Sequence, residues 1–300
     1  MLKRFFAYVE IKTKIASLLP FLLALVYVLY THRTVAWLLT GLFFLSMICF
    51  DMATTALNNY MDTRATRTDL PFSRRTARLI LYALLLAALA SGLALAALTR
   101  PIVLLAGAAC FAVGITYTFG PAPISRMPLG EIFSGIFMGF FIPFLVVTIN
   151  TPSGTLADLI WQPPVLALQA HIPGLARLAL LTIPPVSGIA NIMLANNICD
   201  LAEDVAIKRY TLPYYLGKRR SLQLFTALHL LSLAAIALIG GLGILPRIVL
   251  LTLLVAWPLY RLMRRFWQVQ DKAMTFPFSV TGFVLLIAPQ ILLTALALWL

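Results

Sequence analysis

The sequence is organised as nine long apolar stretches separated by short polar segments. Most stretches hold about 20 residues, the length that an α-helix needs to cross about 30 Å of hydrocarbon. They continue along the whole chain, so the pattern predicts a single all-α membrane domain over residues 1–300. The predicted transmembrane helices cover residues 15–32, 34–60, 77–99, 101–118, 129–150, 175–200, 221–243, 245–267 and 276–299.

The composition strengthens the membrane assignment. The chain is 61% hydrophobic and only 11% charged, whereas about a quarter of the residues in soluble domains are charged. The N-terminus is basic, but no small-residue cleavage site follows its first apolar run, so we expect that run to be retained as a helix. Segment 151–174 is rich in Pro and Gly and predicts a longer loop with room for a short interfacial helix.

The net charge of +13 is distributed unevenly between the two predicted faces. Nineteen of the 23 Lys and Arg residues fall on the face of the N-terminus, and four fall on the other face: Arg33, Arg100, Arg177 and Arg247. This asymmetry predicts that the N-terminus faces the cytoplasm of a cell membrane and that the C-terminus lies outside. The basic surplus therefore indicates topology and contact with anionic headgroups of the lipid bilayer, and no nucleic-acid partner is expected.

A polar motif occurs twice, each time at the end of a predicted helix. Asn58-Asn59-Tyr60-Met61-Asp62 closes the second helix, and Asn196-Asn197-Ile198-Cys199-Asp200 closes the sixth. A further acidic residue follows each copy, Asp69 in the first and Asp204 in the second. Two quasi-repeated bundles, approximately 15–118 and 129–267 with a last helix at 276–299, would bring the motifs together across a central cavity.

The acidic residues of the two motifs have the chemistry of a metal site. Asp200 and Asp204 are four residues apart, so on a helix they lie on one face and repel each other unless a cation lies between them. Oxygen ligands without His or paired Cys favour Mg²⁺. A single Asp is more readily a helix cap or a solvated charge, but the duplication favours a metal–diphosphate site. The expected metal ligands are Asp62, Asp69, Asp200, Asp204, Asn58 and Asn196, with Arg64, Arg67, Lys208 and Arg209 near the phosphates.

Two further residues, Arg126 and Asp51, have two interpretations each. Arg126, in the Pro- and Gly-rich loop 117–126, is either an orientation anchor or a third phosphate contact, and Tyr117 could face the cavity. Asp51 lies inside the second apolar span, where a carboxylate costs about 2.5–3.5 kcal/mol on insertion scales. It is therefore either a catalytic base or anchor for a second substrate, or a hydrogen-bonded structural residue.

The motifs resemble those of the UbiA superfamily of intramembrane aromatic prenyltransferases, which place Asp-rich motifs at the cytoplasmic ends of helices two and six of nine. Three stretches, 50–62, 117–135 and 194–218, are most similar to the menaquinone branch of that superfamily. The first motif departs from the family pattern, because Asn59 replaces its first Asp and Thr66 its last. Asp69 is the candidate substitute. The second motif matches the pattern at Asp200 and Asp204.

The resemblance implies Mg²⁺-dependent transfer of a polyprenyl group from polyprenyl diphosphate to 1,4-dihydroxy-2-naphthoate. Carbon dioxide would be lost and demethylmenaquinol formed. The nearest alternative is a UbiA-type enzyme with another acceptor, such as 4-hydroxybenzoate, haem or a sugar phosphate. A secondary transporter is the alternative from a different class, but it would place its acidic residues near the bilayer midplane. Most of the acidic residues discussed above lie at one predicted face, which favours the enzyme.

Overall fold

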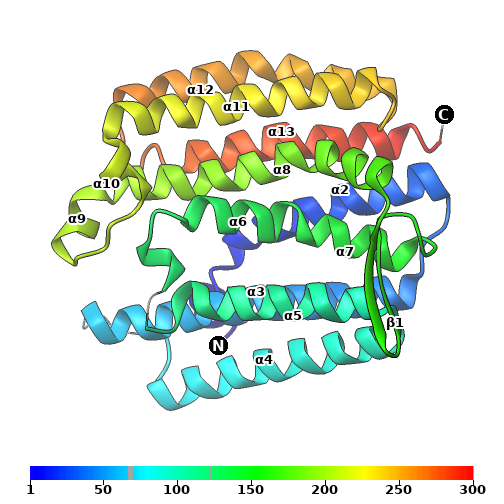
Figure 1. The fold of residues 1–300 in the computed structure, drawn as a ribbon. Coiled ribbons are helices and arrows are strands. Elements are labelled where there is room, and N and C mark those ends of the chain that lie inside the picture. Colours follow the sequence, from blue (N-terminus) through cyan, green and yellow to red (C-terminus); the bar gives the residue numbers. More distant parts are fainter. Residues whose placement is uncertain (67–69, 122, 300) are drawn as a thin grey trace.

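The chain folds into a bundle of long helices that run alongside one another (Figure 1). The computed structural model describes residues 1–66, 70–121 and 123–299 and, of residues 62, 64–66 and 161, the backbone alone. The long helices are α2 (Ile15–His32), α3 (Trp37–Thr66), α4 (Arg74–Ala97), α5 (Pro101–Thr118), α8 (Ile172–Cys199), α11 (Lys218–Gly241) and α13 (Pro277–Leu296).

Shorter elements connect, extend or cap these helices. Two pairs of consecutive elements, α6–α7 and η3–α12, each replace one predicted long helix. The shorter elements are α1 (Leu2–Tyr8), η1 (Ile11–Lys14), η2 (Ile124–Arg126), α6 (Gly130–Gly139), α7 (Phe141–Asn150), β1 (Ala157–Gln162), β2 (Val165–Ala170), α9 (Leu201–Ala206), α10 (Leu212–Leu216), η3 (Arg247–Val255) and α12 (Ala256–Gln268).

Within the described part of the chain, eight helical segments are long and apolar enough to cross a membrane. The eighth predicted helix, 245–267, forms η3 followed by α12 and is not among these eight segments. Pro258 lies in the first turn of α12, where its missing N–H has no helical partner to lose, so the α-helix can begin there. The prediction of nine helices is therefore approximate, whereas the all-α membrane class agrees with the structure.

The helices α6 and α7 form one membrane span with a break at Phe140. Pro143 lies in the first turn of α7, so the backbone restarts a helix there, as it does at α12. Gly135 and Gly139 form a small-residue stripe of the kind that allows two membrane helices to approach closely. A Cβ on Gly139 would lie 2.6 Å from backbone atoms of Val186 on α8. Backbone contact at this point sets the position of α6 against α8.

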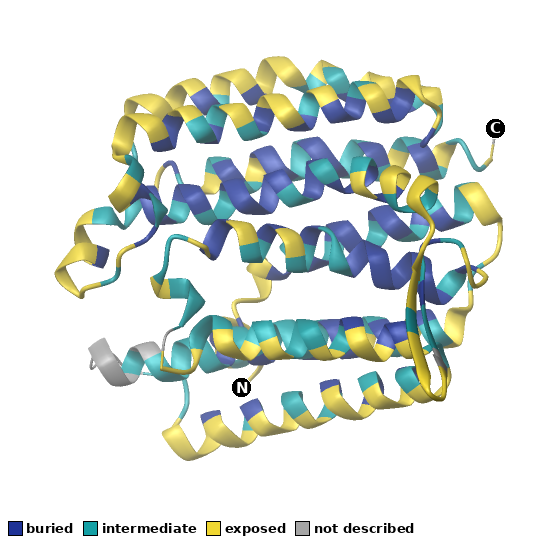
Figure 2. Ribbon diagram, in the orientation of Figure 1, coloured by how far each residue is buried: buried dark blue, intermediate teal, exposed yellow. Residues whose placement is uncertain are grey.

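Burial is concentrated in the middle of the bundle, and the outer helices carry exposed faces (Figure 2). On α4 the exposed side chains are large and apolar, among them Leu79, Leu86 and Leu93. A soluble protein rarely exposes a continuous apolar face of this kind. The surface is that of a protein surrounded by lipid, which makes the chain an integral membrane protein.

Segment 157–170 forms an antiparallel hairpin, and the expectation of a short interfacial helix in this loop is wrong. The strands pair from Ala157↔Ala170 to Gln162↔Val165. Pro163 and Pro164 occupy the turn, where the ladder requires no N–H donor. Asp158 on β1 accepts a hydrogen bond from Arg100 at 2.7 Å. The hairpin is thereby tied to the start of α5, at the end of the bundle opposite α9 (Figure 1).

Both Asn-containing motifs lie at the same end of the bundle, where α3 and α8 end (Figure 1). Two small apolar clusters hold this end together. One packs Tyr8 and Val9 against α3 and α4, and the other joins α8 to α11 and α12 through Phe225 and Phe266. The division of the chain into two quasi-repeated bundles stays a prediction.

Candidate active site

The second acidic motif is built on the junction between α8 and α9. Asp200 ends α8 and caps α9, and the backbone N–H of Asp204 donates to the carbonyl of Asp200 at 2.8 Å. This is the hydrogen bond of one helical turn. The two residues are therefore one turn apart, as their spacing predicts.

Asp200 is surrounded by polar groups from two parts of the chain. Asn196 Nδ2 donates to Asp200 Oδ2 at 3.2 Å. Lys272, in the segment between α12 and α13, donates from Nζ to Asn196 Oδ1 and to Asp200 Oδ2. Asp271 Oδ1 accepts the backbone N–H groups of the two residues after Lys272, at 2.9 and 2.7 Å, which orders this segment. A cationic group thus already lies against two of the oxygens expected to bind a metal.

Asp204 is buried, with 3% of its surface exposed. Arg209 Nη1 lies 3.5 Å from Asp204 Oδ1, and Arg209 Nε donates to the carbonyl of Ser125 at 2.9 Å. Burial raises the pKa of the Asp204 carboxyl above its ordinary value, and the Arg209 guanidinium opposes that shift. A cation bound at this carboxylate would further favour its ionised form.

Arg209 links the second motif to the segment that contains Tyr117 and Arg126. Arg126 and Lys208 are both exposed, and Lys208 has a left-handed backbone, with φ of 59°. Tyr117 is half-buried at the end of α5, and its hydroxyl accepts a hydrogen bond from Ser134 at 3.1 Å. The structure therefore brings this loop to the second motif through Arg209 and Ser125, and the roles of Arg126, Lys208 and Tyr117 stay predictions.

Much of the first motif lies outside the described residues. The undescribed parts are the whole of Arg67 and Asp69 and the side chains of Asp62 and Arg64. The predicted roles of these four residues stay predictions. Asn58 is half-buried on α3. Asn59 Nδ2 donates to the carbonyl of Tyr8 at 3.0 Å and to Glu10 Oε1 at 3.1 Å. An ionised Asp at this position has no hydrogen to donate, so Asn is suited to tying α3 to the N-terminal segment.

Asp51 has partners for both of its carboxylate oxygens. Lys14 Nζ lies 2.7 Å from Oδ1, and Ser17 Oγ donates to Oδ2 at 2.5 Å. Lys14 Nζ also donates to Thr55 Oγ1 at 2.6 Å. The pair is largely shielded, because the side chains of Lys14 and Asp51 are 6% and 15% exposed. These contacts suit the structural interpretation, and the catalytic role of Asp51 stays a prediction.

Three residues near the site were not predicted as site residues: Glu131, Asn197 and Lys272. Glu131, at the start of α6, accepts a hydrogen bond from Asn197 Nδ2 at 2.9 Å. Lys272 contacts Asp200. A carboxylate at the start of an apolar span, followed by Gly135 and Gly139 on the same helical face, was an available signal for Glu131. Lys272 has no comparable signal, because its position depends on how the segment before α13 folds back on α8.

The described residues supply part of a metal-binding set. No group of three or more His, Cys, Asp or Glu side chains that could hold a metal ion occurs within residues 1–66, 70–121 and 123–299. Asp200, Asp204 and Asn196 provide oxygen donors, which is the chemistry that Mg²⁺ prefers. The ammonium group of Lys272 lies against two of these oxygens, so they do accept a cation. Magnesium usually needs only one or two carboxylates besides water and phosphate, and the set fits it.

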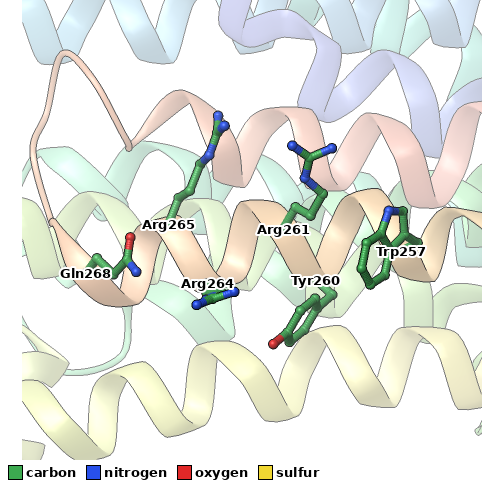
Figure 3. Close-up of a pocket in the computed structure, with 6 residues that line it drawn as sticks. All are labelled: Trp257, Tyr260, Arg261, Arg264, Arg265 and Gln268. Carbon is green, nitrogen blue, oxygen red and sulfur yellow. The ribbon is translucent and has the colours of Figure 1, made fainter.

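A surface pocket of about 270 Å³ lies on α12, and none of its lining residues belongs to an acidic motif. Figure 3 shows Arg261 and Arg265 extending to one side of the helix, with Arg264 and Tyr260 on the other. Trp257 and Tyr260 stack at 6.0 Å between ring centroids. Cations beside aromatic rings are typical of a membrane–water interface, so we interpret this pocket as part of the surface that faces headgroups.

Comparison with known sequences identifies relatives along most of the chain. The profile of the UbiA prenyltransferase family matches residues 17–287. A stretch of 123 residues, 41% of this chain, is 30% identical to the 1,4-dihydroxy-2-naphthoate octaprenyltransferase of Bacillus subtilis (strain 168). That stretch spans 33% of the relative's own length. The family resemblance inferred from the motifs is confirmed.

Comparison with solved structures shows the same fold. A UbiA homolog from Archaeoglobus fulgidus bound to GPP and Mg²⁺ has a TM-score of 0.68 and 14% identity, over 99% of this chain and 100% of that one. The apo structure of a UbiA homolog from Aeropyrum pernix K1 has a TM-score of 0.66 and 20% identity, over 92% and 97%. At these identities the likeness concerns the fold, and the predicted UbiA-like architecture is confirmed.

Proposed function

The chain belongs to the UbiA prenyltransferase family, and from this premise we propose that it transfers a polyprenyl group from polyprenyl diphosphate to an aromatic ring. The proposed acceptor is 1,4-dihydroxy-2-naphthoate, which would place the enzyme in menaquinone biosynthesis. The name of the Bacillus relative supports this acceptor. The three stretches of sequence that resemble the menaquinone branch agree with it.

The observation that carries the proposal is the second motif. Asp200 and Asp204 lie one helical turn apart, and each contacts a cationic side chain, Lys272 and Arg209 respectively. Alternating carboxylates and cations suit a metal bridging to an anionic leaving group. The Archaeoglobus homolog of the same fold was solved with GPP, an allylic diphosphate, and Mg²⁺. Asp62 and Asp69 are the proposed ligands from the first motif, with Asn58 and Asn196 as neutral ligands.

The proposed reaction begins at the diphosphate. When bound, Mg²⁺ neutralises charge on the diphosphate and so makes it a better leaving group. Arg209 and Lys208, with Arg67 and Arg126 as further candidates, bind phosphate oxygens. They stabilise the charge that develops as the allylic C–O bond breaks. The bonding electrons leave with diphosphate, and the prenyl carbon becomes a delocalised carbocation.

The second half of the reaction forms the product. The electron-rich ring attacks the carbocation at the carbon that bears the carboxylate, and a C–C bond forms. The carboxylate then leaves as carbon dioxide, and its bonding electrons restore the hydroquinone ring of demethylmenaquinol. Apolar helices around the site keep out water that would quench the carbocation. We further propose that the motif end of the bundle faces the cytoplasm, as the distribution of Lys and Arg indicates.

The test is a transfer assay with purified protein in detergent. One prenyl diphosphate is supplied with Mg²⁺ and, in turn, 1,4-dihydroxy-2-naphthoate, 4-hydroxybenzoate, haem or a sugar phosphate. We expect prenylated product and released diphosphate with the naphthoate, and no turnover in excess EDTA. Product with another acceptor alone would reassign the substrate. Full activity in EDTA would refute the metal requirement, and the absence of any substrate-dependent diphosphate release would remove the enzyme assignment.

A matched pair of variants tests the motif itself. Asp200→Ala is expected to abolish transfer while the protein still inserts and folds. Glu203→Gln removes a negative charge from the same short helix, but at an exposed position next to the motif. It should leave turnover within about twofold of the wild-type value, because a solvated charge contributes little. Near-normal turnover in Asp200→Ala would contradict the assignment.

A further inference from the structure

Glu131 and Asn197 form a buried polar pair between α6 and α8. Glu131 is 4% exposed and Asn197 is 2% exposed. Asn197 Nδ2 donates to Glu131 Oε1 at 2.9 Å. Within the described part of the chain, neither Glu131 Oε2 nor Asn197 Oδ1 has a hydrogen-bond partner. A buried polar atom without a partner costs about 1–3 kcal/mol, so two such atoms on one hydrogen-bonded pair of side chains require an explanation.

Glu131 lies against α8 because it shares one helical face with two glycines. Glu131, Gly135 and Gly139 follow one another at intervals of four, so they share one face of α6. The two glycines approach the backbone of Val186, with Cβ positions that would lie 2.8 Å and 2.6 Å from its atoms. This approach brings the third member of the stripe, Glu131, into the same interface. Its carboxylate is thus held in place by backbone packing, away from the solvated loops.

The neighbours of this pair are suited to an aromatic ring. Tyr117 and Ser134 are half-buried and share a hydrogen bond of 3.1 Å. The Tyr117 hydroxyl also lies 3.5 Å from Met193 Sδ, and a Cβ on Gly130 would lie 3.2 Å from it. A tyrosine ring and a thioether pack well against a flat apolar ligand. The hydroxyls of Tyr117 and Ser134 can exchange their mutual hydrogen bond for one to a ligand.

The pair is also close to the second acidic motif. Asn197 follows Asn196, a proposed metal ligand, so the two side chains leave α8 at the same level but about 100° apart. One side of this turn therefore serves the proposed metal–diphosphate site, and the next side meets α6 at Glu131. A prenyl acceptor must lie next to the carbon that carries the diphosphate in order to attack it, and a ring held at this pair lies one side of α8 away from the proposed diphosphate site.

We propose that Glu131 Oε2 and Asn197 Oδ1 bind hydroxyl groups of the aromatic acceptor. The inference rests on the proposed prenyl transfer and names the part of the site that holds the ring. A hydroxyl that donates to Asn197 Oδ1 can also accept a hydrogen bond from a protonated Glu131 Oε2, and where Glu131 is ionised a second hydroxyl donates to Oε2, so both buried atoms are satisfied. Glu131 is a positioning residue in this assignment, because it orients the acceptor for attack on the prenyl carbon.

The test is Glu131→Gln, which keeps an oxygen for the Asn197 amide and replaces Oε2 with an amino group. We expect the KM for 1,4-dihydroxy-2-naphthoate to rise by about tenfold or more, since the amide NH₂ that replaces Oε2 can no longer accept a hydrogen bond from the acceptor hydroxyl. The affinity for a non-reactive prenyl diphosphate analogue with Mg²⁺ should stay within about twofold. If Glu131 were purely structural, Glu131→Gln would lower thermal stability without raising the acceptor KM selectively over the dissociation constant of the diphosphate analogue.

Asn191→Leu is the matched control for structural damage. Asn191 is also a buried asparagine of α8, but it faces α11, where it bonds to the carbonyl of Phe225 at 3.0 Å and to His229 Nδ1 at 2.8 Å. Its loss should lower the unfolding temperature and leave the acceptor KM unchanged. A similar rise of the acceptor KM in Asn191→Leu and Glu131→Gln would overturn the proposal.

A second measurement uses the wild-type protein and needs no variant to fold. Competitors that lack one hydroxyl, such as 1-hydroxy-2-naphthoate, should bind about tenfold or more weakly than the dihydroxy compound. Equal binding of both would overturn the proposal. If the wild type transfers the prenyl group but Glu131→Gln keeps its acceptor KM, only this inference fails. If the wild type transfers to no acceptor, the proposed function itself fails.

Discussion

The ammonium group of Lys272 lies against the carboxylate of Asp200, although the two residues are 72 positions apart in the chain. The lysine also contacts Asn196, so it occupies two of the oxygens that we assign to the metal. A lysine in this position acts as a built-in counter-ion. It offsets the negative charge of the motif before a metal is present.

Lys272→Gln is therefore expected to tighten Mg²⁺ binding measured without diphosphate. The ammonium group competes with the metal for Asp200, and the lysine is about half exposed. Exposed ion pairs contribute about 0.2–1 kcal/mol, which corresponds to about a 1.4- to 5-fold lower dissociation constant. Lys218→Gln, at the start of α11, removes an equal charge and serves as the control. Weaker binding in Lys272→Gln would mean that the lysine supports the metal site.

Arg209 is expected to hold the loop before α6 in place. Its guanidinium bridges Asp204 and the carbonyl of Ser125. Arg209→Ala should reduce turnover by about tenfold or more, because it removes both a proposed phosphate ligand and the partner of a buried carboxylate. It should also speed limited proteolysis within residues 119–129. Arg219→Gln, an exposed change on α11, is the comparison, and equal proteolysis of the two would contradict the bridging role.

The glycine stripe on α6 predicts a strong dependence on side-chain size. Gly139→Ala places a methyl group against the backbone of Val186, and overpacking of this kind typically costs about 1–3 kcal/mol. We expect a lower unfolding temperature in detergent. Gly107→Ala, on α5, meets nothing within 4 Å and should be neutral or slightly stabilising. Equal stability of the two variants would show that α6 and α8 do not need this close contact.

The buried pair of Lys14 and Asp51 gives a test of the two interpretations of Asp51. Asp51→Asn leaves the Lys14 ammonium without its carboxylate, and breaking a buried pair typically costs about 3–5 kcal/mol. The double variant Lys14→Met with Asp51→Leu should recover most of that stability, because it leaves no uncompensated charge. We expect the double variant to retain transfer activity. An inactive but stable double variant would instead support a catalytic Asp51.

The membrane helices were predictable because their signal is local. Twenty apolar residues in succession specify a membrane span whatever surrounds them, and α2 begins and ends where the pattern places it, at Ile15 and His32. The hairpin at 157–170 was missed because its strands are stabilised by pairing with each other and by Arg100. Such contacts leave little trace in a Pro- and Gly-rich stretch.

The sequence by itself determined the membrane class, the duplicated Asn–Asp motifs and the chemistry of Asp200 and Asp204. Each follows from residue type and short spacing, and hydrocarbon thickness and helical periodicity convert these directly into structure. Only the tertiary structure decided that Lys272 meets Asp200, that Arg209 reaches Ser125 and that Glu131 lies against Asn197. These contacts join residues 66 to 84 positions apart in the chain. They depend on how close the helices pack, which for α6 and α8 is set by two glycines and the backbone of Val186.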